Sequence, residues 1–141
     1  PLQFDYPDDP HAAQVETQLM LGEGLMIAPV LEQNATGRYV YLPEPMKLVR
    51  MRSTDDYETE NLDAGHHYID VGLRELAFFI RPGCVVPLAQ AAQSVAELDT
   101  AHLTLLHNVT QGVGTYVLYD DDGYTRDYRN PAHYRTLTVT V

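Results

Sequence analysis

The feature that most constrains this fold is the length of its apolar runs, which are short and closed by glycine, proline or charged residues. Leu25–Leu31 has no polar side chain, which predicts a strand covered on both faces, with Pro29 at an edge or bulge because it cannot donate a ladder hydrogen bond. We predict strands over residues 25–31, 38–42, 47–52, 68–71, 76–80, 84–88, 103–109, 114–119 and 134–141. Such spacing is typical of an antiparallel β-sandwich, so we predict a mainly β protein.

In two of these strands the side chains alternate clearly between the two faces. Residues 47–52 alternate in a way that predicts a half-exposed strand, and residues 134–141 alternate leucine and valine with threonine. The charged stretch 53–67 is either a solvated loop or a hairpin. Residues 89–99 are rich in alanine, but we interpret them as a linker with a short turn.

The N-terminal part differs from the rest. Residues 1–7 form a short extended run that ends at Pro7. Asp9 can then cap a helix whose first residue is Pro10, and Gly22 can stop it. Apolar residues at helical spacing complete the pattern: Ala12, Val15, Leu19 and Met20. We therefore predict one short helix over Pro10–Leu21.

The charge balance narrows what the chain can bind. Lys and Arg total 9 and Asp and Glu total 20, for a formal net charge of -11. Such a surface repels phosphate backbones and anionic membranes, so we expect no nucleic-acid and no membrane partner. No run reaches the ~20 apolar residues of a membrane helix. The opening PLQFDYPDD has no basic leader and no initiator Met, so we expect no signal peptide and a piece of a longer chain.

The cysteine count and two sequons bear on the compartment. Cys84 is the only cysteine, so an intrachain disulfide is excluded. This fits a reducing environment, and we expect a cytoplasmic protein. The sequons at Asn34 and Asn108 keep a secreted, glycosylated protein open as the alternative.

The acidic triplet Asp120–Asp122 before Gly123 invites a calcium interpretation. An EF-hand loop with Gly123 in sixth place would begin at Leu118 and end at Arg129, and neither supplies the required oxygen ligand. Asp-Gly after an apolar strand instead predicts a hairpin turn, because both residues tolerate positive φ.

Other chemistries lack their motifs. His66 and His67 are adjacent, and His102 and His107 fall on opposite faces of one strand, without a cysteine partner or an i, i+4 pair. Cys84 lies in an apolar run, where a thiol stays protonated. No serine lies in a Gly-x-Ser-x-Gly elbow, and no glycine spacing fits a phosphate loop. We expect no catalytic residue, no cofactor-binding residue and no metal ligand.

The tyrosines leave one binding hypothesis open. The chain has 10 tyrosines and no tryptophan, and tyrosine faces can either stack on sugar rings or simply pack in strands. The candidates are Tyr39, Tyr41, Tyr116, Tyr119, Tyr124, Tyr128 and Tyr134. Carboxylates for glycosidic cleavage could be proposed among Asp120–Asp122 and Asp127, but these share one turn rather than two sides of a cleft.

Five stretches of the sequence resemble stretches of a known protein family. They are PLQFDYPDD (1–9), QLMLGEGLMIAPVL (18–31), YVYLP (39–43), IRPGCVVPLA (80–89) and YVLYDDDGYTRDY (116–128). In this order they resemble the C-terminal region of glycoside hydrolase family 31, the α-glucosidases and α-xylosidases. The resemblance implies that residues 1–24 are the last strand and helix of a (β/α)8 barrel, residues 25–90 a proximal β-sandwich and residues 91–141 the start of a distal β-sandwich. The barrel remnant and the sandwich sheet would then cover the two faces of residues 25–31. The implied structural signatures are Pro29, Tyr41, Leu42, Pro43, Arg81, Gly83 and Pro87.

The retaining mechanism that the resemblance implies uses two aspartates on barrel strands upstream of this chain, so no catalytic residue is carried over. The sequence departs from the family pattern at Pro82, where glycine is usual, and at Cys84, where serine is common. It also lacks the tryptophan that often follows YLP. Because of these departures, the sequence leaves undecided which sugar the parent enzyme would act on.

We therefore expect a non-catalytic accessory fragment of a retaining α-glycosidase, an α-glucosidase in the first place, that braces its own catalytic barrel. An independent carbohydrate-binding module is the alternative, and a generic protein-interaction sandwich is a third. Without a barrel, the apolar side chains of residues 1–21 would meet water: Leu2, Phe4, Val15, Leu19 and Met20. We expect either a homodimer or this segment folding back on the sandwich.

Overall fold

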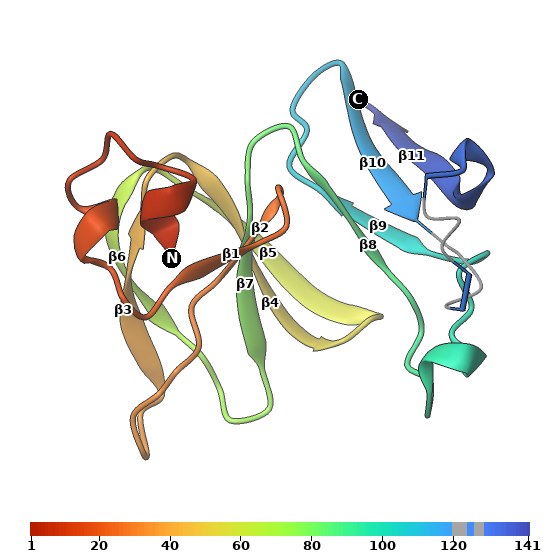
Figure 1. Ribbon diagram of the computed structural model, residues 1–141. Coiled ribbons are helices and arrows are strands. Elements are labelled where there is room, and N and C mark those ends of the chain that lie inside the picture. Colours follow the sequence, from red (N-terminus) through yellow and green to blue (C-terminus); the bar gives the residue numbers. More distant parts are fainter. Residues whose placement is uncertain (120–123, 126–128) are drawn as a thin grey trace.

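The computed structural model describes residues 1–119, 124–125 and 129–141, and this part of the chain consists mainly of antiparallel strands (Figure 1). Its helical structure is limited to the 3-10 turns η1 (Leu2–Phe4), η2 (Ala12–Gln14), η3 (Val95–Glu97) and η4 (Pro131–His133). The strands are β1 (Leu19–Leu21), β2 (Leu25–Ile27), β3 (Gly37–Leu42), β4 (Met46–Ser53), β5 (Asp56–Leu62), β6 (Gly65–Asp70), β7 (Leu76–Ile80), β8 (Val85–Leu88), β9 (Thr104–His107), β10 (Val113–Tyr119) and β11 (Tyr134–Thr140). The predicted mainly β class is confirmed.

A five-stranded sheet in the order β1-β2-β7-β4-β5 forms the centre of the molecule. In its antiparallel register Phe79 lies between Met26 and Leu48, and all three side chains are 0% exposed. Their neighbours Val49 and Phe78 point to the opposite face, where they are buried as well. The central strands are therefore covered on both faces, which explains their nearly continuous apolar sequence.

One face of this sheet packs against the β3–β6 ribbon. Val40 and Leu42 of β3 and Ile69 of β6 share a core with the Phe79 face of the sheet. Leu2 and Ala12, from the two N-terminal turns, complete the same core. The two layers form a sandwich, and the N-terminal segment folds back onto it, one of the two outcomes expected for these residues. The predicted extended run over residues 1–7 contains the turn η1 instead.

The opposite face packs against the β8–β9 pair. Leu106 of β9 shares a second core with Val49, Phe78 and Ile80. Residues 25–31 were expected to lie between a sheet and the segment that precedes them. Leu25 and Ile27 pack on this second core, whereas Met26 shares the first core with Leu2 and Ala12 of residues 1–24. The prediction of a half-exposed strand over residues 47–52 is wrong for its first half, because neighbouring side chains there are buried in different cores.

The predicted helix over Pro10–Leu21 is wrong. Asp9 does cap a turn with its carboxylate, but helical structure ends at Gln14. Leu19–Leu21 pairs with β2 as an antiparallel hairpin, and Gly22, at φ +64, lies in the hairpin turn rather than at a helix end. The apolar spacing fitted a helix equally well. Pairing prevails because it gives the backbone of this segment a partner strand while Met20 still packs on the first core.

The charged stretch 53–67 forms hairpin strands rather than a solvated loop. β5 pairs with β4 along its length, and β6 begins after it at Gly65. At the exposed end of this hairpin Arg52 makes ion pairs with Asp56 at 2.8 Å, Glu58 at 3.0 Å and Glu75 at 2.8 Å. The many charged residues of this stretch therefore lie on exposed strands.

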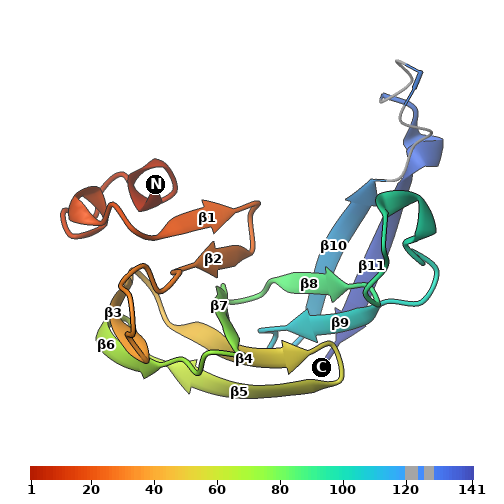
Figure 2. The ribbon, with the colours of Figure 1, turned by 90° about the horizontal axis from the view of Figure 1, so that it is seen from below.

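The C-terminal strands extend away from the central sheet (Figure 2). β8 pairs with β9, and β10 pairs with β11 from Val113↔Thr140 to Tyr119↔Tyr134. Along β11 the leucine and valine are half-buried and the threonines exposed, as predicted. The linker over residues 89–99 contains the single turn η3, also as predicted. The expected Asp-Gly turn at residues 120–123 lies outside the described residues.

Candidate functional site

A polar clasp of Tyr6, Glu44 and Arg81 ties three separate segments together. The Tyr6 hydroxyl donates to Glu44 Oε1 at 2.5 Å, and Arg81 Nε donates to the same oxygen at 2.6 Å. The guanidinium also lies over the Tyr6 ring, 5.1 Å from its centroid. A further bond from Arg81 to the Glu23 carbonyl, 3.1 Å long, adds the β1–β2 turn to the clasp. Arg81 thus has the structural role that the resemblance implied.

The electrostatics of the clasp favour a Tyr6 hydroxyl that keeps its proton and donates a hydrogen bond, rather than one that transfers the proton. Burial, together with the hydrogen bond to Glu44, raises the pKa of Tyr6 well above its ordinary value. The phenol therefore stays protonated at neutral pH and keeps donating to Glu44.

A second polar contact joins Asp9 to Tyr41. The Tyr41 hydroxyl donates to Asp9 Oδ2 at 2.7 Å, while Asp9 Oδ1 accepts the backbone N–H bonds of His11 and Ala12 at 2.9 and 3.3 Å. The hydrogen bond from Tyr41 is the largest cause of the lowered pKa of Asp9. Asp9 is therefore an ionised cap that also anchors the start of the chain to β3.

Gln18 has a structural role that sequence reasoning missed. Its side chain is 2% exposed; Nε2 donates to the Tyr41 carbonyl and Oε1 accepts from the Tyr41 N–H, both at 2.8 Å. The amide thus pairs with β3 as a neighbouring strand residue would. A lone glutamine before an apolar triplet gives no sequence signal of this kind, because the pairing depends on where β3 lies.

An aromatic face lies on the outer side of the β3–β6 ribbon. Tyr39 and Tyr68 are opposite each other in the register, with ring centroids 5.0 Å apart at an interplanar angle of 72°. Tyr41 and His66 form the next pair at 4.9 Å, and His11 lies 5.5 Å from Tyr41 and 5.8 Å from His66. Two of the predicted tyrosines are therefore gathered here, with Tyr68 and His66 added by strand pairing and His11 by the N-terminal turn η2.

A groove of about 500 Å³ opens beside the first pair, and we call it the tyrosine groove. Its lining is Thr17, Val30, Leu31, Glu32, Ala35, Gly37, Arg38, Tyr39 and Tyr68. Arg38 fixes its floor, because Nη2 donates to Thr17 Oγ1 at 2.6 Å and Nη1 donates to the Pro29 carbonyl at 2.5 Å. The groove is therefore bordered by a bonded framework rather than by loose side chains.

The other predicted tyrosines lie elsewhere. Tyr119 and Tyr134 meet across the β10–β11 pair with centroids 5.1 Å apart, and Tyr116 is 38% exposed on β10. Tyr124 is 96% exposed, and Tyr128 lies outside the described residues. These tyrosines are thus not part of the face on β3–β6.

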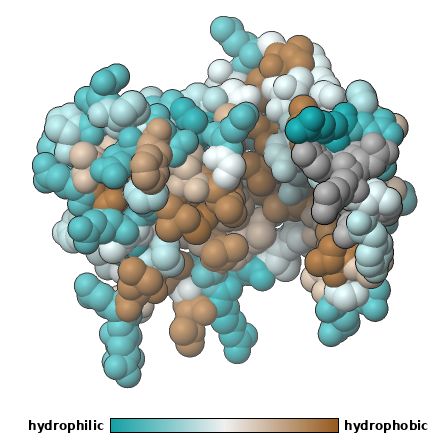
Figure 3. All heavy atoms as spheres, in the orientation of Figure 1, coloured by the Kyte–Doolittle hydropathy of each residue, from teal (hydrophilic) through white to brown (hydrophobic). Residues whose placement is uncertain are grey.

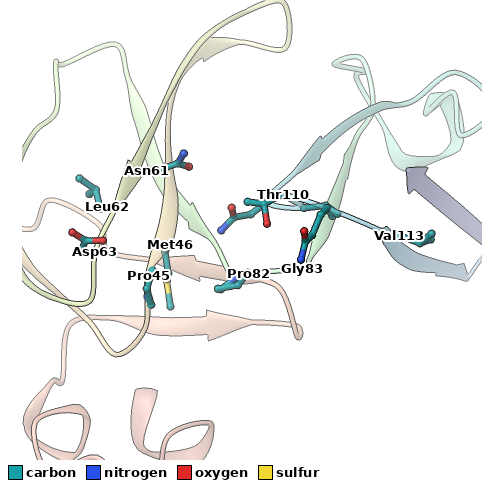
Figure 4. Close-up of a pocket in the computed structure, with 12 residues that line it drawn as sticks. Pro45, Met46, Asn61, Leu62, Asp63, Pro82, Gly83, Thr110 and Val113 are labelled. Atoms are coloured by element: carbon teal, nitrogen blue, oxygen red, sulfur yellow. The ribbon is translucent and has the colours of Figure 1, made fainter. Parts of the chain in front are cut away.

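A second pocket, of about 340 Å³, lies between the central sheet and the segment that joins β9 to β10. Figure 4 shows Met46 and Asn61 on one side of it and Gly83 and Thr110 on the other. Asp63 is the carboxylate in its lining. Apart from that group the lining is apolar, amide or hydroxyl, which offers no acid–base pair for catalysis.

The histidines and Cys84 show no chemical cluster. Among the described residues, no three His, Cys, Asp or Glu side chains are placed to hold a metal ion. His102 Nδ1 pairs with Asp99 at 2.8 Å, and His107 Nδ1 accepts the Val109 N–H at 3.3 Å. Burial raises the pKa of the Cys84 thiol, so it stays protonated at neutral pH, as expected.

The two sequons have different surroundings. Asn34 is exposed, at φ 64 in a connecting segment. Asn108 is 9% exposed and its Nδ2 donates to the Ile80 carbonyl at 2.9 Å, so a glycan on this nitrogen would break a buried bond. In the part of the chain described, no helix has the length and apolarity needed to cross a membrane.

Comparison with known proteins identifies one matching family model and several related enzymes. The family model described as the glycosyl hydrolase family 31 C-terminal domain matches residues 1–86. Alpha-glucosidase 2 of Bacillus thermoamyloliquefaciens is 31% identical over 136 residues, which cover 96% of this chain and 16% of the relative. An alpha-xylosidase of Saccharolobus solfataricus is 30% identical over 137 residues, covering 95% of this chain and 18% of the relative. The chain therefore spans less than a fifth of these relatives.

Solved structures share the fold. A GH31 dextranase of Flavobacterium johnsoniae superposes with a TM-score of 0.76 over 99% of this chain and 17% of that chain, at 24% identity. A GH31 alpha-xylosidase of Xanthomonas citri gives 0.71 over 99% of this chain and 15% of that chain, at 26% identity. The resemblance carried by the five sequence stretches is confirmed, and the chain belongs to the glycosyl hydrolase family 31 C-terminal domain family.

Proposed function

We propose that this chain is the non-catalytic accessory domain of a retaining α-glycosidase, an α-glucosidase in the first place, and that it braces that enzyme's catalytic barrel. The family match and the small share of each relative that the chain covers support this. The proposal includes the expected division into residues 1–24, 25–90 and 91–141. It also includes a cytoplasmic location, supported by the single cysteine.

The placement of carboxylates supports a non-catalytic role. A retaining glycosidase needs two carboxyl groups ~5–5.5 Å apart on either side of the scissile bond. The pocket of Figure 4 has one carboxylate in its lining, Asp63, and the tyrosine groove has one, Glu32. A further pocket, beside Ala28 and Ala77, has Glu32 and Glu75, but Glu75 is bonded to the Gly72 N–H and to Arg52.

The observation that carries the bracing role is the firm attachment of the N-terminal segment. Leu2 is 0% and Ala12 1% exposed in the first core, and the Tyr6 clasp holds the same segment through polar contacts. The resemblance makes this segment the end of a barrel. A domain can brace a neighbour only if it is rigidly joined to it, and these contacts supply such a joint.

An apolar docking face, made of Leu19 and Leu21 on β1, supports the same proposal. These side chains are 38% and 58% exposed. In the β1–β2 register the two leucines share the sheet face that β8–β9 covers further along, but at this edge of the sheet they stay uncovered. Figure 3 shows an apolar area over the β1–β2 hairpin. Such a patch usually marks a contact surface, and we assign it to the barrel.

The test uses the longer enzyme that carries this chain. Leu21→Asp should lower the temperature at which α-glucosidase activity is lost, because the barrel contact would then bury a charge. Leu73→Asp is the matched control, since that leucine is 105% exposed, and it should leave this temperature unchanged. Equal effects of the two changes would refute the docking face. Release of nitrophenol from an aryl α-glucoside by this chain alone would refute the non-catalytic role.

A further inference from the structure

We propose that the tyrosine groove binds a neutral α-glucan segment, with the rings of Tyr39 and Tyr68 stacked on its sugar rings. The choice of an α-glucan rests on the proposed function, whereas the choice of a neutral, ring-shaped ligand rests on the groove itself.

The two rings are exposed although they lie within the continuous pairing of the ribbon. Tyr39 is 74% and Tyr68 52% exposed, and the two lie directly opposite each other in the β3–β6 register. Their edge-to-face packing, with centroids 5.0 Å apart, leaves ring surface free on both. The face of an aromatic ring is electronegative, so it attracts the C–H groups that line one side of a sugar ring.

The backbone beneath Tyr68 leaves room for that ring. A Cβ on Gly37 would lie 2.4 Å from the Ile69 carbonyl oxygen and 2.9 Å from the Tyr68 hydroxyl, so only glycine fits there. The absence of a side chain at Gly37 lets the Tyr68 ring lie over the strand. A ring that is ordered before the ligand arrives loses less entropy on binding.

The floor of the groove is ordered as well, and its chemistry disfavours anions. Arg38 donates to Thr17, Pro29 and its neighbour's carbonyl, so its guanidinium is committed to protein acceptors. The charge that remains at the rim is the carboxylate of Glu32. Together with the formal net charge of -11, this disfavours an anionic ligand and leaves an acceptor for a ligand that donates hydroxyl hydrogen bonds.

The size of the groove agrees with a short oligosaccharide. Its volume of about 500 Å³ lies within the range of roughly 300–1,000 Å³ that small-ligand pockets occupy. Its combination of two aromatic faces with one carboxylate and the Thr17 hydroxyl provides stacking and directional polar contacts together.

The test titrates maltotetraose and, separately, isomaltotetraose into this chain, followed by amide chemical shifts in NMR spectra. We expect saturable shifts at Gly37, Tyr39 and Tyr68 with at least one of the two sugars. Tyr39→Ala should weaken binding about tenfold or more, and Tyr39→Phe should restore most of it, because the ring is kept. Tyr57→Ala is the matched control, since this β5 tyrosine is 37% exposed and lies outside the groove. It should leave binding unchanged.

Three outcomes would overturn the proposal: no saturable shifts with either sugar, shifts located away from the groove, or equal losses in Tyr39→Ala and Tyr57→Ala. A Tyr39→Ala change that leaves sugar binding intact but destabilises the longer enzyme would instead mark the groove as a protein contact. The docking-face experiment does not depend on these results. Failure of sugar binding with a clear effect of Leu21→Asp would therefore reject this inference alone.

Discussion

Gln18 offers the sharpest test of how the N-terminal segment is held. Replacing it with methionine keeps the length and volume of the side chain but removes both 2.8 Å hydrogen bonds to the Tyr41 backbone. The Tyr41 N–H and carbonyl would then lack partners beside a residue that is 2% exposed. Each orphaned buried group costs about 1–3 kcal/mol, and partial access of water to Tyr41 reduces the sum. We expect Gln18→Met to lower the free energy of unfolding by about 2–4 kcal/mol.

Urea denaturation followed by far-ultraviolet circular dichroism measures this loss. With a slope of roughly 1.5 kcal/mol per molar urea, the midpoint should fall by about 1.3–2.7 M. Gln14→Met is the matched control, because Gln14 is an exposed glutamine of the same segment. Its midpoint should stay within about 0.3 M of the unsubstituted chain. Equal midpoints for the two variants would show that the Gln18 amide does not act as a strand partner.

Three further predictions concern backbone space and pH. Gly37→Ala should destabilise the chain by about 1–3 kcal/mol in the same urea assay, since its Cβ would collide with a backbone carbonyl; an unchanged midpoint would contradict this. The pKa of Tyr6 is raised by burial and by Glu44, so its contribution to stability is complete below about pH 10 and lost as pH rises above it. Tyr6→Phe should flatten the fall in urea midpoint between about pH 9 and 11, and unaltered steepness would count against the clasp. The hydrogen bond from Arg52 lowers the pKa of Asp56, so its contribution is present above about pH 4 and lost as pH falls further. Asp56→Asn should flatten the acid limb of the same profile, and parallel limbs would refute the pairing.

Local patterns predicted the strands well and the N-terminal segment badly. Short apolar runs closed by glycine or proline identify strands because their limits depend on neighbouring residues alone. Pro10–Leu21 failed because apolar spacing that suits a helix can also belong to a turn followed by a short strand. Pairing with β2 decided between them, and no feature inside the segment records that partner.

The aromatic face on β3–β6 was foreseen in part. Tyr39 and Tyr41 were among the predicted tyrosines, and both face outward on β3. Tyr68 and His66 were missed because they join this face only through the β3–β6 register. The Asp-Gly turn at residues 120–123 stays a prediction, since it lies outside the described residues.

The sequence by itself determined most of the strand segments, with β1 and β5 as the exceptions, and the family to which the chain belongs, because both are carried by short contiguous stretches. Only the tertiary structure decided what covers each sheet face, which polar groups meet in the clasp, and which tyrosines border a groove. The physical reason is that these contacts join residues far apart in the chain. Their meeting depends on strand order and register, which are set by the packing of the whole molecule.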